Sequence, residues 1–319
     1  MGDGAGSPDL SFATASAADF LIEQRTRVLE AFQHLSHDLS QGLDSLVRYV
    51  LERSLPESGR NDQKVVPDSR VLPLPRRSAG PKGAVMTRFV LVPGAWLGAW
   101  AWKAVTPLLE KEGHAAFPVT LTGMGERVHL ASKEIGMETA IADVLNVIEY
   151  NEIDDFVLVG HSFAGKVAAA VADRAHTKVS KVIYVDAIRP ERVRTPQAGF
   201  DPSGEFGPLP PGSFAIPLTE GIIGRIGPDV KGATLKRMMS LATPWPTKLA
   251  ADPITLSKNY DALKEAYIFC SLSGDPVDEI IAGKWGKLEG PHKVIEAGHW
   301  PMITRPGELA RDLVALSRQ

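Results

Sequence analysis

The sequence predicts an α/β fold in which a mostly parallel sheet of about six strands is flanked by helices. From Thr87 onward, short apolar runs alternate with amphipathic helical segments. The runs are rich in valine and isoleucine and are apolar throughout, which is typical of strands buried on both faces. An alternation of this kind indicates a parallel sheet with helices on both sides.

The predicted elements have ordinary lengths for such a fold. Strands are expected at 88–94, 115–123, 155–160, 181–187, 265–274 and 292–298. Helices are expected at 101–113, 138–151, 163–175 and 306–318. The first helix ends at a glycine, a residue that commonly terminates helices.

The chain divides into regions of different composition. Residues 1–85 hold apolar residues at helical spacing, followed by a linker rich in Pro, Gly and Ser, and we expect an N-terminal extension with no catalytic part. A helical arm that pairs two copies is the alternative, and it would make the protein a homodimer. The α/β domain is expected at 86–319. Its interval of about 188–262 is too long for a loop, so we expect a helical cap subdomain over the carboxyl ends of the strands.

Composition argues against several classes of function. The formal net charge is −3 over 319 residues, which gives no electrostatic reason to bind nucleic acid or an anionic membrane. The single cysteine, Cys270, lies in an apolar run and is interpreted as a buried core thiol. Neither a membrane-spanning stretch nor a secretory pattern occurs, so a cytoplasmic protein is expected. We expect no metal and no cofactor, because no motif for binding either is present.

The strongest motif joins a predicted strand to an alanine-rich predicted helix. It reads GHSFAG at 160–165, a form of the G-x-S-x-G turn. A serine hydroxyl is a weak nucleophile and must stand exposed beside a base, which a sharp strand-to-helix turn achieves. The small residues Gly160 and Ala164 let strand and helix approach each other. Ser162 is therefore the predicted nucleophile.

The expected base is a histidine at the end of the last predicted strand. His299 lies there, on a loop directly before the C-terminal helix, where it can reach the serine. His161 is adjacent to the nucleophile in sequence, so the turn would point it elsewhere. We expect His161 to pack or to support its neighbours.

Three aspartates are candidates for the acid that orients the histidine. Asp275 directly follows the predicted strand at 265–274 and is preferred, because its loop should lie near His299. Asp278 is three residues on and would face another way if a helix begins at Pro276. Asp186 ends the strand at 181–187, and some hydrolases take the acid from that earlier strand. All three remain candidates.

Two backbone amides are predicted to stabilise a developing oxyanion. One belongs to Phe163, directly after the serine, and the other to Ala95, in the loop after the first strand. Gly94 gives that loop the freedom to turn the Ala95 amide inward.

Several segments together resemble a known family. VLVPGAWLGAWAW, LTGMGERVHL, VLVGHSFAG, TPWPTKLAADPITL and EAGHWPM are similar to the esterase and hydroxynitrile-lyase branch of the α/β-hydrolase superfamily, over about residues 87–318. That branch includes plant methyl esterases and bacterial carboxylesterases, some of which cleave pyrethroids. The resemblance implies the α/β-hydrolase fold, with Ser162 as nucleophile, His299 as base, and Ala95 and Phe163 as oxyanion donors.

The chain departs from the pattern of this branch at three places. Pro93 stands where the family usually has histidine, and proline removes an N–H from that loop. The segment from Cys270 to Asp275 is offset from the usual position of the acid. Trp300 stands where hydroxynitrile lyases carry a lysine, which argues against lyase chemistry.

These observations predict a serine carboxylesterase that hydrolyses a hydrophobic carboxylic ester through an acyl-enzyme on Ser162. The alternatives are a hydroxynitrile lyase or a carbon–carbon bond hydrolase on the same scaffold, or a ligand-binding protein without catalysis. Apolar residues are expected to line the substrate pocket. They are Trp96, Trp300, Phe214, Met238, Met239 and Trp245.

Overall fold

The computed structural model describes residues 86–187, 203–209, 211–282, 288 and 290–319. The expected N-terminal extension, 1–85, and the start of the expected cap, 188–202, lie outside these residues. The described residues are built around one sheet of 6 strands in the order β2-β1-β3-β4-β7-β8. All neighbouring strands in this sheet run parallel.

All six predicted strands are present, which confirms the expected sheet. Five of them end a few residues before their apolar runs do, and the remaining residues form loops at the carboxyl edge of the sheet, whereas β3 ends one residue beyond its predicted run, at His161. The strands are β1 (Arg88–Val92), β2 (Ala115–Pro118), β3 (Phe156–His161), β4 (Val179–Val185), β7 (Glu265–Cys270) and β8 (His292–Ile295).

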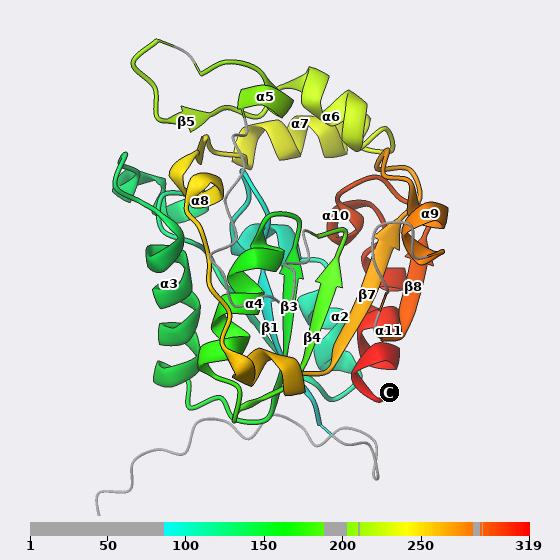
Figure 1. Ribbon diagram of the computed structural model, residues 1–319. Coiled ribbons are helices and arrows are strands. Elements are labelled where there is room, and N and C mark those ends of the chain that lie inside the picture. The colour runs from blue at the N-terminus through cyan, green and yellow to red at the C-terminus, as the bar shows by residue number, and fades with distance from the viewer. Residues whose placement is uncertain (1–85, 188–202, 210, 283–287, 289) are drawn as a thin grey trace, which may run out of the picture. The chain divides into compact units, whose positions relative to one another are not determined.

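Helices cover both faces of the sheet (Figure 1). On one face, α4 (Ala164–Arg174) packs against β3, β4 and α3 (Met137–Tyr150). On the other, α11 (Pro306–Ser317) packs against β4, β8 and α2 (Thr106–Lys111). Every residue of α4 from Ala164 to Asp173 is buried, and its small alanines allow this close contact on all sides.

The predicted helix at 101–113 is two shorter elements in the structure. A 3₁₀ helix, η1 (Ala99–Trp102), precedes α2, which has a proline in its first turn. Proline lacks the amide that would continue a preceding helix and clashes with the carbonyl four residues earlier, so the helix restarts at Thr106.

The cap of the structure lies between Ser203 and Pro246, over the carboxyl ends of the strands (Figure 1). It contains α5 (Ser203–Phe206), β5 (Ala215–Ile216), α6 (Glu220–Ile226), α7 (Gly232–Leu241) and β6 (Trp245–Pro246). The chain then returns along the domain, where α8 (Lys248–Ala251) contacts α3 and η3 (Lys258–Ala262) contacts α4. The second part of the expected interval therefore lies beside the sheet.

Three short helices complete the described chain near this edge. They are η2 (Gly125–Leu130), α9 (Val277–Ile281) and α10 (Pro301–Thr304).

Cys270 is fully buried, as its sequence context predicted, and burial raises the pKa of its thiol. The cysteine is therefore a packed core residue.

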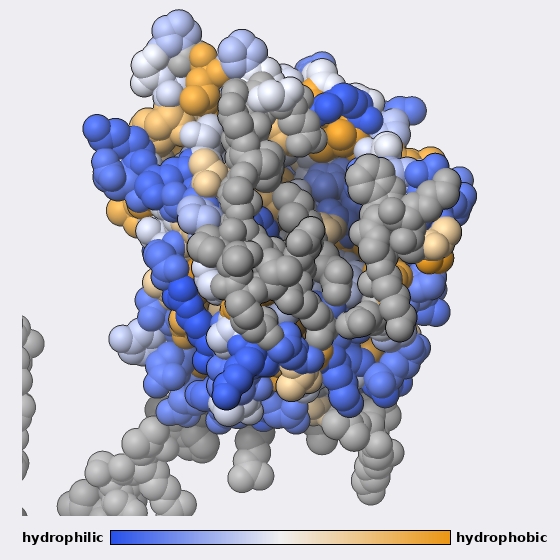
Figure 2. All heavy atoms as spheres, viewed as in Figure 1, coloured by the Kyte–Doolittle hydropathy of each residue, from blue (hydrophilic) through white to orange (hydrophobic). Residues whose placement is uncertain are grey.

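The exposed surface differs between α3 and the cap. Figure 2 shows mainly hydrophilic residues over α3 and clusters of hydrophobic residues on the cap. Phe214, before β5, is 36% exposed. Among the described residues, no helix has both the length and the apolar character that crossing a bilayer requires.

Candidate active site

Ser162 stands on a sharp turn between β3 and α4. Its φ is 58°, a left-handed conformation that costs a non-glycine residue free energy and is common at functional sites. Its amide donates to the carbonyl of Val185 at 3.2 Å. A Cβ at Gly160 would lie 2.8 Å from both the Ala164 carbonyl oxygen and the Ala168 Cβ, so only glycine lets α4 approach this strand. The turn therefore has the geometry that the motif predicted.

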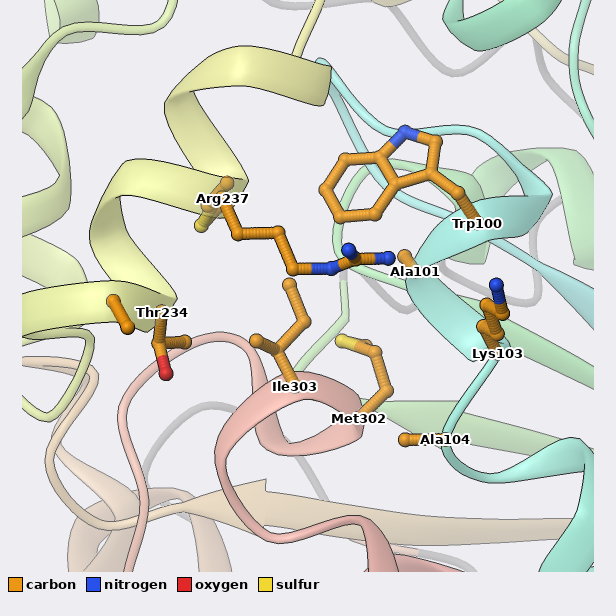
Figure 3. Close-up of a pocket in the computed structure, with 10 residues that line it drawn as sticks. Trp100, Ala101, Lys103, Ala104, Thr234, Arg237, Met302 and Ile303 are labelled. Carbon is orange, nitrogen blue, oxygen red and sulfur yellow. The ribbon is translucent and has the colours of Figure 1, made fainter.

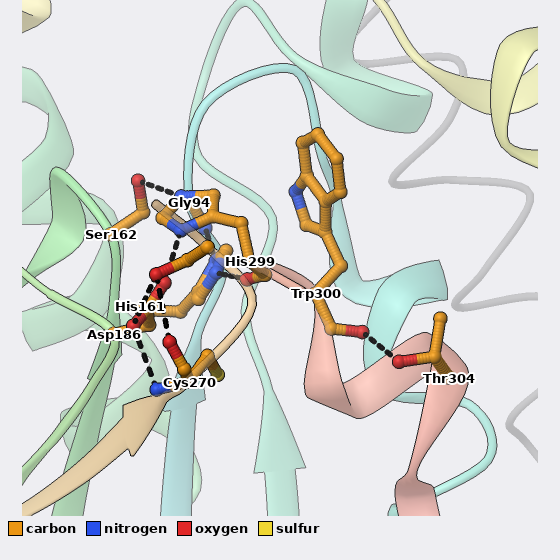
Figure 4. A network of polar contacts seen from close by, with 9 residues as sticks. Gly94, His161, Ser162, Asp186, Cys270, His299, Trp300 and Thr304 are labelled. Carbon is orange, nitrogen blue, oxygen red and sulfur yellow. Dashed lines mark hydrogen bonds and ion pairs between the residues drawn. The ribbon is translucent and has the colours of Figure 1, made fainter. Parts of the chain in front are cut away.

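The structure brings Ser162 and His299 together, although they are far apart in sequence (Figure 4). The Nε2 atom of His299 lies 2.8 Å from the Ser162 Oγ. Its Nδ1 atom lies 2.6 Å from the Oδ2 of Asp186. With a carboxylate accepting the Nδ1 proton, Nε2 is free to accept the serine proton, which is the arrangement of a general base.

The carboxylate at His299 is Asp186, the third candidate, and not Asp275. Asp186 is 5% exposed, whereas Asp275 is exposed on the loop after β7 and Asp278 is exposed in the first turn of α9. Both ring nitrogens of His299 are already hydrogen bonded, to Asp186 and to Ser162. The preference for Asp275 is therefore corrected, and Asp278 is not at the histidine either.

Asp186 is held by backbone and side-chain contacts around its carboxylate. It directly follows β4 with a φ of 43°, and its amide donates to the Ile268 carbonyl at 2.7 Å. Its Oδ1 atom accepts from the Cys270 amide at 3.0 Å and lies 3.4 Å from the Ser273 hydroxyl. These contacts come from β7 and its loop, so that loop supports the acid without supplying it.

His161 is fully buried and connects the loop after β1 with the turn that carries His299. Its Nδ1 accepts a hydrogen bond from the Gly94 amide at 3.1 Å, so the ring proton lies on Nε2. Nε2 then donates to the carbonyl of His299 at 2.7 Å. The ring thus ties the loop after β1 to the turn that carries His299. Sequence reasoning expected a supporting or packing role but could not identify these partners.

Burial lowers the pKa of His161 to about 3, and the nearby His299 adds to this effect. In the unfolded chain an ordinary histidine has a pKa of about 6.5. Between these two pH values His161 is protonated in the unfolded state and neutral in the folded state. The free energy of unfolding therefore decreases as the pH falls through this range.

We therefore expect a His161→Gln variant to lose part of the acid sensitivity of the protein. Urea midpoints measured from pH 7 to pH 4 should fall less steeply with pH for His161→Gln than for the wild-type chain. His129→Gln is the control, because His129 is exposed. Equal slopes for wild type and His161→Gln would contradict a buried neutral histidine at this position.

The loop after β1, which contains Ala95, passes close to the nucleophile turn. Ala95 is 4% exposed and Phe163 is 2% exposed. Within the described part of the chain, neither amide donates a hydrogen bond to a protein acceptor. A Cβ at Gly94 would lie 2.6 Å from the His161 Nδ1, so glycine is required where this loop passes the nucleophile turn.

Trp96 fastens the same loop to the cap. Its φ is 67°, a strained value for a residue with a side chain. Its indole Nε1 donates to the Ile216 carbonyl at 2.9 Å, and its own carbonyl accepts from the Thr243 amide at 3.0 Å. Both partners lie on cap segments, so the cap holds this loop in its strained conformation.

Aromatic rings gather near the serine turn. Trp245 lies 5.0 Å from Phe163 and 5.7 Å from Trp96, measured between ring centroids. Phe206 of the cap lies 5.1 Å from Trp96 and was missed by sequence reasoning. Its short helix carries no motif that would have marked it.

The other expected pocket residues have different surroundings. Trp300 is fully buried and packs against His299, with ring centroids 5.5 Å apart. Phe214 is exposed at the surface, and Met239 is partly buried against the core. Met238 is buried and borders a separate hollow between α7, η1 and α10. The predicted pocket residues thus do not form one lining.

The turn that carries His299 is covered by the end of α6. The His299 amide donates to the Ile226 carbonyl at 2.8 Å. A Cβ at Gly298 would lie 2.6 Å from the Gly227 Cα, and one at Gly227 would lie 2.5 Å from the Trp300 ring. The cap and the histidine turn therefore touch backbone to backbone, and two glycines make this contact possible.

Gly227→Ala is expected to lower kcat by about 10- to 100-fold, because displacing a catalytic group by about 1 Å has an effect of this size. The added methyl group would push Trp300, and with it the adjacent His299. Steady-state kinetics on an ester substrate measure the effect. Gly224→Ala is the matched control, since a Cβ there meets nothing within 4 Å. Wild-type kcat in Gly227→Ala would contradict this account.

Among the described residues, no group of three or more His, Cys, Asp or Glu side chains is placed to hold a metal ion. What these residues arrange is a serine, a histidine and an aspartate in series, and among the described residues the amides of Ala95 and Phe163 donate to no protein acceptor. This arrangement is suited to attack on a carbonyl carbon.

Comparison with known proteins agrees with the fold and extends over most of the α/β domain. A model described as the alpha/beta hydrolase family matches residues 89–312. A carbendazim hydrolyzing esterase of Nocardioides sp. (strain SG-4G) is 33% identical over 253 residues, covering 72% of this chain and 100% of the relative. Methylesterase 9 of Arabidopsis thaliana is 27% identical over 254 residues, covering 73% of this chain and 98% of the relative. An extracellular α/β-hydrolase from a Paenibacillus species has the same fold, with a TM-score of 0.61 at 18% identity over 74% of this chain and 100% of that one. The chain belongs to the α/β-hydrolase family.

Proposed function

We propose that this protein is a serine carboxylesterase that hydrolyses small hydrophobic carboxylic esters. The observation that carries the proposal is the continuous hydrogen-bonded series from the Ser162 hydroxyl through His299 to Asp186. Relatives named as a carbendazim hydrolyzing esterase and as a methylesterase support the same reaction class.

In the proposed reaction His299 takes the proton of Ser162 as the hydroxyl oxygen attacks the ester carbonyl. Asp186 keeps the Nδ1 proton in place and stabilises the imidazolium that forms. The amides of Ala95 and Phe163 donate to the oxyanion of the tetrahedral intermediate.

His299 next donates its new proton to the departing alcohol, and the carbonyl re-forms as an acyl-enzyme on Ser162. A water molecule then attacks the acyl carbonyl and gives its proton to His299. Collapse of the second intermediate releases the carboxylic acid and returns the proton to Ser162.

The walls of the site favour an apolar substrate. Phe163, Trp96, Trp245 and the cap residue Phe206 form a cluster of rings beside the serine turn. Burying apolar substrate surface contributes about 0.8 kcal/mol per methylene group, or roughly fourfold in affinity. We therefore expect activity to rise with the length of an apolar acyl chain until the pocket is full.

A series of p-nitrophenyl esters from acetate to octanoate tests this proposal. We expect kcat/KM to increase over the first members of the series, and we expect a fluorophosphonate probe to label Ser162 stoichiometrically, as detected by peptide mass spectrometry. Mandelonitrile should release no cyanide above the uncatalysed rate. Cyanide release without ester turnover would contradict the esterase and favour the lyase alternative.

A further inference from the structure

A hollow lies between the cap and the sheet domain, and the catalytic serine does not line it. It has a volume of about 390 Å³ and is lined by residues of η1, α7 and α10 and by the residues that directly follow η1. Neither Ser162 nor His299 is among its lining residues. A volume of this size falls within the range of small-molecule sites in proteins.

The floor of the hollow is apolar. Trp100, Met238, Met302 and Ile303 contribute large apolar side chains to it, and they come from three different elements. Figure 3 shows the Arg237 side chain extending from α7 toward η1, between Trp100 and Ile303. A ligand in this hollow would thus meet apolar groups at its base.

The charge of the hollow is positive. Lys103 and Arg237 are its two charged lining residues, and both are cationic on a chain whose formal net charge is −3. Within the described part of the chain, no side-chain hydrogen bond or ion pair engages either of them. Both are exposed, so each can reorient toward a ligand without losing a protein partner.

The first turn of α7 faces the same hollow. Ala233 and Thr234 line it, and the residue before the helix, Lys231, makes no side-chain cap hydrogen bond. The amides at the start of a helix lack intrahelical acceptors and carry the positive end of the helix dipole. The positive end of α7 therefore borders the same hollow as Arg237 and Lys103.

We propose that this hollow binds a monocarboxylate with an apolar tail, its carboxylate on Arg237 and Lys103 and its tail against Trp100, Met302 and Ile303. The planar guanidinium matches a carboxylate with two parallel hydrogen bonds, whereas the lysine contributes a flexible point charge. The inference is independent of the esterase proposal, because it concerns a different site.

Calorimetry on the full chain tests the proposal by measuring the affinity for the anion 4-phenylbutyrate. The neutral and cationic matches, which share its apolar tail, are 4-phenylbutanol and 4-phenylbutylamine. We expect the anion to bind at least tenfold more tightly than either match, and its affinity to fall as salt rises. Arg237→Gln should weaken binding of the anion by about three- to fivefold, as expected for one exposed charge. Arg237→Gln combined with Lys103→Gln should weaken it further.

Lys236→Gln is the matched control, since Lys236 lies on the same helix, is exposed and does not line the hollow. The location is tested separately with crystals grown with 4-(4-bromophenyl)butyrate, in which the anomalous signal of bromine should lie beside Trp100. Equal affinity for the anion and the alcohol, unchanged affinity in the double variant, or bromine only beside Ser162 would each overturn the proposal.

Discussion

Replacing Ser162 by alanine is expected to lower kcat on p-nitrophenyl esters by about 10⁴- to 10⁶-fold. The hydroxyl oxygen is the atom that forms the acyl-enzyme, and within the described residues it is the group in contact with the His299 Nε2. The fold should not change, because alanine removes a single oxygen atom from a turn whose conformation is set by β3 and α4. Steady-state kinetics measure the loss, and circular dichroism checks the fold.

The same variant should lose all labelling by the fluorophosphonate probe. Ser240→Ala is a suitable control, since the Ser240 hydroxyl donates within its own helix to the Arg237 carbonyl at 2.8 Å and has no other partner among the described residues. Ester turnover that survives in Ser162→Ala, after contaminating esterases are removed, would show that another group attacks the carbonyl.

Asp186→Asn is expected to lower kcat by about 10⁴-fold, the size of effect that follows when the amide replaces the acid of such a triad. The asparagine side chain fits the same space, but its NH₂ group can donate to Nδ1. The imidazole would then carry its proton on Nε2, facing the serine, and could no longer act as a base. The affinity for substrate should change little, so the loss is expected in kcat.

Asp275→Asn and Asp278→Asn provide the matched comparison, because Asp275 is exposed on the loop after β7 and Asp278 is exposed at the start of α9. Each is expected to keep kcat within about twofold of the wild-type value, as is usual for exposed substitutions away from a site. A large loss in Asp275→Asn with normal turnover in Asp186→Asn would mean that the loop supplies the acid after all.

The strands, the flanking helices and the nucleophile turn could be read from the sequence because each depends on a local pattern. The buried run before Gly160 identifies β3, and the alanine-rich segment after Ser162 identifies α4. His299 could also be located, since the last parallel strand must end at the same edge of the sheet as β3.

The acid could not be chosen from the sequence, because the choice depends on how two neighbouring strands end. The strands β4 and β7 are adjacent, so Asp186 and Asp275 both follow strands that end near His299. The chain after Cys270 turns back, with the Ser273 amide donating to the Cys270 carbonyl at 3.3 Å, and Asp275 is left exposed. The path of a turn of this kind leaves no periodic pattern in the sequence.

The cap was harder to predict for a related reason. Its contacts with the site run through backbone atoms, such as the Ile226 carbonyl and the Cα of Gly227, and these have no side-chain signature. Phe206 and the glycine pair Gly227 and Gly298 could be recognised only once the chain was folded.

The backbone contact between Gly227 and Gly298 also limits how substrate can enter. If the end of α6 moved away as part of a lid, the His299 amide would lose its acceptor, the Ile226 carbonyl, and Trp300 would lose its contact with Gly227. His299 would then be held less firmly whenever the lid was open. Substrate that entered by that route would meet an active site in which His299 is not in position. We therefore expect the end of α6 to stay in place during turnover and substrate to enter past another part of the cap.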